Sequence, residues 1–204
     1  MDPRVTEHAE IIASWSTDLK QGDTVLIDVQ EGGEPLAKAL VAEAAKRGAQ
    51  PLTLLHQDGA GRAFLLNAQE ETIRTPPAHM SALAEATDVF IFIRAGSNTR
   101  SNSDVPREKQ QARSKAMEEI RETRLAKRWC LTMHPTPSLA QEAGMSTEAF
   151  QELYYGMTLI DWPSFAKEVE RVADRFEGVK EVHLVAPDTD LYLPVSDRPW
   201  VASI

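Results

Sequence analysis

The sequence predicts an α/β protein with an open, mainly parallel five-stranded sheet, helices on both faces and the truncated start of a second domain. The first indication is residues 24–30, Thr-Val-Leu-Ile-Asp-Val-Gln, a nearly continuous apolar run typical of a strand that is covered on both faces. Two glycines and a proline follow it, a helical pattern extends from Leu36 to Ala45, and residues 51–56 form the next apolar run. A strand, a helix and another strand in so little chain predict a parallel crossover connection.

The first helix is expected at about residues 5–20. Five residues at spacings of three and four make an apolar face that includes one histidine: Val5, His8, Ile12, Trp15 and Leu19. A histidine within such a stripe is more often a hydrogen-bonded core residue than a ligand. We therefore expect His8 to be structural.

The remaining elements continue the alternation. Apolar periodicity and turn residues predict helices at about 60–68, 78–86, 106–127 and from 161 onward. Further strands are expected at 89–94, 129–133 and 180–186, and these complete the predicted sheet. Cys130 lies inside one of these strands with no histidine near it in sequence, which favours a buried structural thiol over a nucleophile.

Composition limits the kind of protein that the chain can be. A length of 204 residues with 42% hydrophobic residues suffices for one well-buried core. The net charge of −9 argues against a general nucleic-acid binder, since the phosphate backbone would be repelled, and no apolar run is long enough to span a membrane. The first residues lack the pattern of a secretion signal, and a lone cysteine fits a reducing compartment. We therefore expect a cytoplasmic protein without nucleic-acid or membrane partners.

Polar residues at the strand ends suggest one place where a ligand could bind. In an open parallel sheet, ligands collect in the crevice beyond the carboxyl ends of the strands. The candidates there are two histidines, an arginine and two carboxylates: Glu31, His56, Arg94, His134 and Asp188. They suit an anion or a metal ion, although strand ends carry polar residues whether or not anything binds.

The familiar catalytic motifs are not found in the sequence. The segment 31–34, Glu-Gly-Gly-Glu, is neither a dinucleotide-binding glycine pattern nor a P-loop, and there is no Gly-x-Ser-x-Gly or His-Glu-x-x-His motif. Five histidines at positions 8, 56, 79, 134 and 183 show no spacing typical of metal ligands. The residues alone therefore assign neither a catalytic residue nor a metal ligand.

The last residues suggest a second domain. Residues 188–195 read as a turn into a new strand, and residues 200–204 read as the start of another. Apolar strands need a partner sheet, so we expect 1–187 to be an N-terminal α/β domain and 188–204 to be a linker and the first strands of a missing C-terminal catalytic domain. We expect this tail to pack against a neighbouring chain or to lie extended, and not to join the main sheet as a central strand.

Several short segments together resemble one family. They are Gly22 to Leu26, Trp129-Cys130, Pro135-Thr136-Pro137, Ala140, Ala143-Gly144-Met145-Ser146 with Phe150, Thr189-Asp190-Leu191, and Arg198 before Trp200. The likeness spans most of the chain. In these segments the chain resembles the aminopeptidase T and aminopeptidase S family of metallo-aminopeptidases.

The resemblance implies a function for the parent protein. Members of that family remove N-terminal residues from peptides with two divalent ions, such as zinc or cobalt, that activate water, and they form homodimers. Beyond the position matching Ile204 they continue with a segment roughly Asn-Met-Pro-x-Gly-Glu, whose glutamate binds metal. This chain has no counterpart of that segment, so the resemblance gives it no catalytic residue, no metal ligand and no expected metal.

Two functions thus remain open. The first is an N-terminal scaffold domain of a metal-dependent aminopeptidase, inactive alone, whose parent contacts its peptide substrate through the missing domain and forms a homo-oligomer. The alternative is a free-standing α/β module that binds a small anionic ligand at the carboxyl edge of the sheet.

Overall fold

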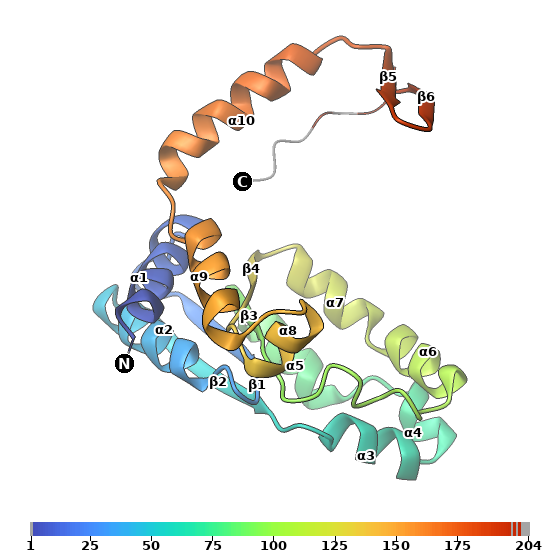
Figure 1. Ribbon diagram of the computed structural model, residues 1–204. Coiled ribbons are helices and arrows are strands. Elements are labelled where there is room, and N and C mark those ends of the chain that lie inside the picture. Colours follow the sequence, from blue (N-terminus) through green and yellow to red (C-terminus); the bar gives the residue numbers. More distant parts are fainter. Residues whose placement is uncertain (1, 197, 199, 201–204) are drawn as a thin grey trace. The chain divides into compact units, whose positions relative to one another are not determined.

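The computed structural model describes residues 2–196, 198 and 200 and divides the chain into two compact units. The first unit is Met1–Leu159 and the second is Ile160–Ile204 (Figure 1). Each unit has secondary structure of its own.

The first unit contains a four-stranded parallel sheet in the order β2-β1-β3-β4. The strands are β1 (Thr24–Gln30), β2 (Gln50–His56), β3 (Val89–Arg94) and β4 (Arg128–Met133). Leu26 of β1 is in register with Leu52 of β2 on one side and with Phe90 of β3 on the other. Residues Val25 to Val29 are all buried, as the continuous apolar run predicts for a central strand.

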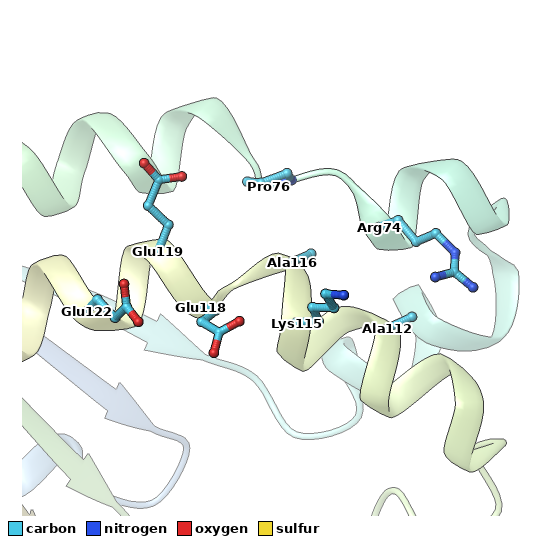
Figure 2. A pocket seen from close by; sticks show the side chains of 8 residues that line it. All are labelled: Arg74, Pro76, Ala112, Lys115, Ala116, Glu118, Glu119 and Glu122. Atoms are coloured by element: carbon cyan, nitrogen blue, oxygen red, sulfur yellow. The ribbon is translucent and has the colours of Figure 1, made fainter.

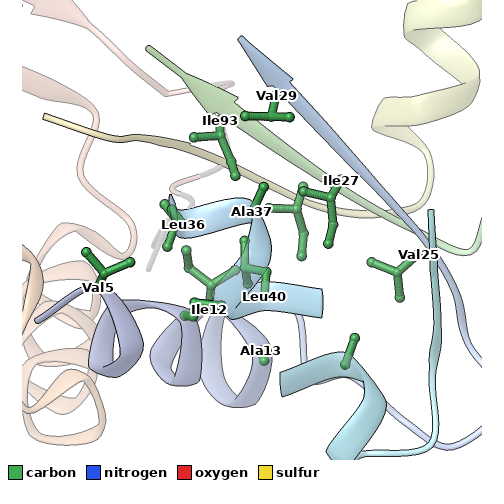
Figure 3. Close-up of a cluster of buried hydrophobic side chains, with 14 of the residues drawn as sticks. Val5, Ile12, Ala13, Val25, Ile27, Val29, Leu36, Ala37, Leu40 and Ile93 are labelled. Atoms are coloured by element: carbon green, nitrogen blue, oxygen red, sulfur yellow. The ribbon is translucent and has the colours of Figure 1, made fainter. Parts of the chain in front are cut away.

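Helices cover both faces of this sheet, which confirms the predicted α/β class. Their bounds are α1 (Pro3–Ile11), the π-helical turn η1 (Ile12–Ser16), α2 (Glu34–Lys46), α3 (Ala60–Asn67), α4 (Glu70–Arg74), α5 (Ala78–Ala86), α6 (Arg107–Ala116), α7 (Glu118–Leu125), α8 (Pro137–Glu142) and α9 (Thr147–Thr158). On one face, Ile27 packs with Leu36 and Leu40 of α2 and with residues of α1 and α9 (Figure 3). On the other, Leu26 and Phe90 pack with residues of α5 and α7.

Two helices differ in detail from the prediction. The helix expected at 5–20 ends at η1, where the Thr17 backbone N–H and hydroxyl both donate to the Ile12 carbonyl and close the last turn. The helix expected at 106–127 is divided into α6 and α7 at Met117, whose φ of −94° and ψ of 2° depart from helical values. The spacing of apolar residues continues unchanged from α6 into α7, so the sequence pattern does not predict the break at Met117.

The second unit contains α10 (Trp162–Phe176) and a hairpin of β5 (Glu181–Ala186) and β6 (Thr189–Pro194). The prediction that residues 180–186 form a fifth strand of the main sheet is wrong, because β5 pairs antiparallel with β6 in a separate two-stranded sheet. Ala186 pairs with Thr189, and Asp188 between them adopts a φ of 55°, so the chain reverses within two residues. As expected, β6 does not join the main sheet, but residues 189–194 pair with β5 of the same chain, where a tail packed on a neighbouring chain or lying extended was expected. Of the strand expected at 200–204, only Trp200 lies within the described residues.

Gly33, which caps α2, lies in close contact with the core. A Cβ atom there would lie 2.8 Å from Val29 Cγ2 and 3.0 Å from Ile93 Cγ2, both on buried β-branched side chains. We expect Gly33→Ala to lower the free energy of unfolding by about 1–3 kcal/mol, since the added methyl overpacks this contact. Gly61 in α3 has nothing within 4 Å of such a Cβ.

Gly61→Ala is therefore the matched control, and should raise the free energy of unfolding by about 0.5–1 kcal/mol. Urea unfolding monitored by circular dichroism measures both variants. Equal effects of the same sign would contradict the close packing at Gly33.

Candidate functional site

Three strand ends form a polar row at the carboxyl edge of the sheet. His56 ends β2 in register with Gln30, which ends β1, and Arg94 ends β3 one residue beyond the pair Val29 and Ile93. Because side chains alternate along a strand, these three share the face of Leu26 and Phe90. All three line a cavity of about 540 Å³.

A buried carboxylate lies one step behind this row. The Asp28 side chain is 3% exposed, and its Oδ2 accepts a hydrogen bond of 3.2 Å from Arg124 Nη2 of α7. Its Oδ1 lies 2.5 Å from His56 Nε2. This second contact is an ion pair when His56 is protonated, and its geometry departs from that of a regular hydrogen bond.

The pairing changes the acid–base behaviour of His56. Contact with the Asp28 carboxylate raises the pKa of His56 above its ordinary value, against the opposing effects of partial burial and of the Arg124 charge. The Asp28 carboxylate therefore favours the imidazolium form of His56.

Hydrogen bonds join the loops that line the cavity. Asp58, after β2, accepts hydrogen bonds from the backbone N–H of Ser97 at 2.7 Å and from its hydroxyl. The backbone N–H of Asp58 donates to Glu31 Oε2 at 2.9 Å. Arg62 of α3 forms an ion pair with Asp104 across the same opening. The loops after β1, β2 and β3 are thus joined by side-chain hydrogen bonds.

The structure brings together some of the residues expected in the crevice. His56 and Arg94 line the cavity, and Glu31 lies beside it in a neighbouring hollow of about 440 Å³ while bonding to Asp58. His134 lies apart from this cavity, although its backbone N–H donates to the Arg94 carbonyl at 2.8 Å. Asp188 belongs to the second unit, on the turn between β5 and β6, because β5 is not a strand of the main sheet.

Asp28 is the site residue that the sequence did not single out. It stands inside the apolar run 24–30, which predicts a buried strand and not a site residue. A lone carboxylate in such a run is itself a signal, because burying an unpaired charge is costly and a partner is therefore required. Its partners come from other strands and helices, so sequence spacing does not identify them.

A second hollow, between α7 and the segment 74–76, is lined by three glutamates. Figure 2 shows Glu118, Glu119 and Glu122 on α7 at one end of this hollow, with Arg74 at its other end. Two of these glutamates lie in the first turn of α7, where the helix dipole stabilises negative charge. Helix stabilisation explains the position of Glu118 and Glu119.

The described residues do not fit a metal pair. They contain no group of three or more histidine, cysteine, aspartate or glutamate side chains that could hold a metal ion. Asp28 and His56 form the nearest approach to one in the cavity, but they contact each other, and the Arg124 guanidinium beside them opposes a cation. No catalytic step through a metal ion can be assigned to these residues.

Comparison with known proteins identifies the family. The model of the thermophilic metalloprotease (M29) family matches residues 1–203. The chain belongs to this metalloprotease family. Metal ions are therefore part of the family's chemistry, and the resemblance noted in the sequence is confirmed. No curated protein sequence matches the chain.

A solved structure shares the fold of this M29 chain. Wild-type AmpT from Thermus thermophilus is similar over 94% of the chain, with 18% sequence identity and a TM-score of 0.74. The match covers 53% of the AmpT chain, so this M29 chain spans about half the length of that protein. A CurK enoyl reductase matches with 14% identity and a TM-score of 0.31 over 76% of this chain and 50% of that one, which is too weak to add to the argument. None of the helices in the described part of the chain is long and apolar enough to cross a membrane.

Proposed function

We propose that the chain is the N-terminal α/β domain of a metal-dependent aminopeptidase that removes N-terminal residues from peptides. Its role is that of a scaffold, and the metal pair and the contacts to the peptide belong to a catalytic domain outside these 204 residues. The parent protein uses two divalent ions, such as zinc or cobalt, works in the cytoplasm and forms a homo-oligomer.

One observation carries this proposal. The family model spans residues 1–203, yet the likeness to AmpT covers 94% of this chain and only 53% of that one. A two-metal hydrolytic site needs several anionic ligands that converge on ions about 4 Å apart. The carboxylates of Asp28 and Asp58 at the carboxyl edge of this sheet are engaged by neighbouring residues and do not offer such a set.

We expect the 204-residue chain to hydrolyse no aminoacyl p-nitroanilide above the buffer rate, with zinc or cobalt added. A longer protein that joins this chain to a C-terminal catalytic domain of the family should hydrolyse this substrate and lose activity with a chelator. An N-acetylated substrate is the control, because an aminopeptidase requires a free amino group.

Metal content after dialysis gives an independent measurement. Turnover that a chelator abolishes, together with two metal ions per 204-residue chain, would contradict the scaffold role. Cleavage of the acetylated substrate by the longer protein would contradict the aminopeptidase assignment while leaving the metalloprotease family intact.

A further inference from the structure

We propose that the cavity at the carboxyl edge of the main sheet is a binding site for a small anion, a carboxylate or a phosphate group, held by Arg94 with Gln30 and His56. The site is separate from the proposed peptidase chemistry and concerns only residues of the first unit.

The strand order places the cavity where such folds bind ligands. From β1 the chain passes through α2 to β2 on one side, whereas β3 lies on the other side of β1. The helix α2 packs on one face of the sheet, and α5 and α7 pack on the other. Consecutive connections therefore diverge between β1 and β3, which leaves a crevice at the topological switch point. Gln30 and Arg94 end the two strands that border it.

The row at the strand ends presents donors. Gln30 Oε1 accepts a hydrogen bond of 3.0 Å from the Ala95 backbone N–H, which orients the amide group and leaves its NH₂ as the group available to a ligand. His56 directs Nε2 to Asp28, so Asp28 does not engage Nδ1, which carries a second N–H donor when the ring is protonated. Arg94 adds a guanidinium that carries donors only. From His56 to Arg94 the row spans two strand spacings, about 10 Å.

The charges in the cavity favour an anion. Two of the three acidic residues that line it are already engaged, Asp28 by Arg124 and His56, and Asp58 by Ser97. The guanidinium of Arg94 forms no ion pair with a described residue. The chain has a net charge of −9, so most of its surface repels anions. An unpaired guanidinium that faces a cavity attracts an anion to that one place.

One residue opposes binding and supplies a sharp test. Glu142 of α8 is exposed and also lines the cavity, so its carboxylate repels an anion at the rim. Removing this charge should tighten binding, whereas removing Arg94 should weaken it. A cavity of about 540 Å³ is large enough to admit each of the three probes used below.

The test uses the 204-residue chain and three probes at constant ionic strength, because salt screens exposed charges. The probes are inorganic phosphate, N-acetyl-alanyl-alanine and the amide of that dipeptide. We expect amide NMR signals of residues 30, 56 and 94–98 to shift and saturate with phosphate or with the acid. The dipeptide amide should not bind. Saturation by phosphate alone or by the dipeptide acid alone identifies the source of the anionic group.

Variants separate this site from general charge effects. Arg94→Gln should weaken binding about tenfold, as expected when one charged hydrogen-bonding group is lost. Arg107→Gln removes the same charge from the exposed start of α6 and should leave the affinity unchanged. Glu142→Gln should tighten binding by a few fold. Equal losses in the two arginine variants, shifts scattered over surface residues without saturation, or equal binding of the amide would overturn the proposal.

Discussion

Arg124→Met should lower the free energy of unfolding by about 3 kcal/mol near neutral pH, because it removes one of two partners from a buried carboxylate. The Asp28 side chain is 3% exposed and cannot turn to solvent, whereas Arg124 is 24% exposed. Methionine retains most of the aliphatic length of arginine but loses the guanidinium, which lies 5.1 Å from the centroid of the Phe90 ring. His56 remains as a partner, which places the loss at the low end for a broken buried pair.

A double-mutant cycle isolates the charge interaction. In the Asp28→Asn background no carboxylate is left without its partner, so Arg124→Met should cost less than about 1 kcal/mol there. Chemical unfolding of the four proteins at one pH gives the coupling energy. The same loss in both backgrounds would mean that Arg124 acts through packing on Phe90 and not through Asp28.

Acidification should destabilise the first unit through a second buried group. His8 is 2% exposed and forms edge contacts with Tyr154 and Tyr155. Burial, with a smaller contribution from the charge of His134, lowers the pKa of His8 to about 4 from its ordinary value of 6.5. The folded state therefore holds His8 neutral, while the unfolded chain takes up a proton first as the pH falls. The stabilisation is complete above pH 6.5 and is lost towards pH 4, with a total of roughly 3 kcal/mol.

Urea unfolding between pH 7.5 and pH 4 measures this loss. His8→Phe should flatten the dependence of unfolding free energy on pH by about one proton, and His79→Gln at an exposed position should not. An unchanged slope in His8→Phe would contradict the assignment. Burial lowers the pKa of His134 as well, so some acid sensitivity should remain. The raised pKa of His56 has the opposite effect on stability. Its contribution to the free energy of unfolding is complete below pH 6.5 and is lost as the pH rises through the raised pKa. This contribution is small because the His56 side chain is half-exposed.

The sequence predicts the sheet well where burial on both faces leaves no ambiguity. The run 24–30 is the central strand, and residues 89–94 form its neighbour. Residues 180–186 were also correctly read as a strand, but hydrophobicity alone does not specify which partner a strand pairs with. The two-residue turn at Pro187 and Asp188 sets that partner, because it returns the chain antiparallel at once.

The candidate cavity was predictable in part for a similar reason. His56 and Arg94 were found because the carboxyl ends of parallel strands meet at one edge whatever the loops do. Asp28 was not found, since its partner Arg124 lies 96 residues away and arrives only when α7 covers the sheet. The expectation for His8 is confirmed, because its Nε2 lies 3.1 Å from Thr132 Oγ1 within the core.

The central place of β1 also has a consequence for synthesis on the ribosome. β2 follows β1 after one short helix, but β3 pairs with β1 across a separation of 64 residues, as the contact of Thr24 with Asp88 records. At about 5–20 residues per second, that interval takes roughly 3–13 s. During this time one edge of this buried strand has no neighbour from its own chain. The nascent polypeptide therefore presents Val25 to Val29 to chaperones, or to other unfinished chains, before its fold can cover them.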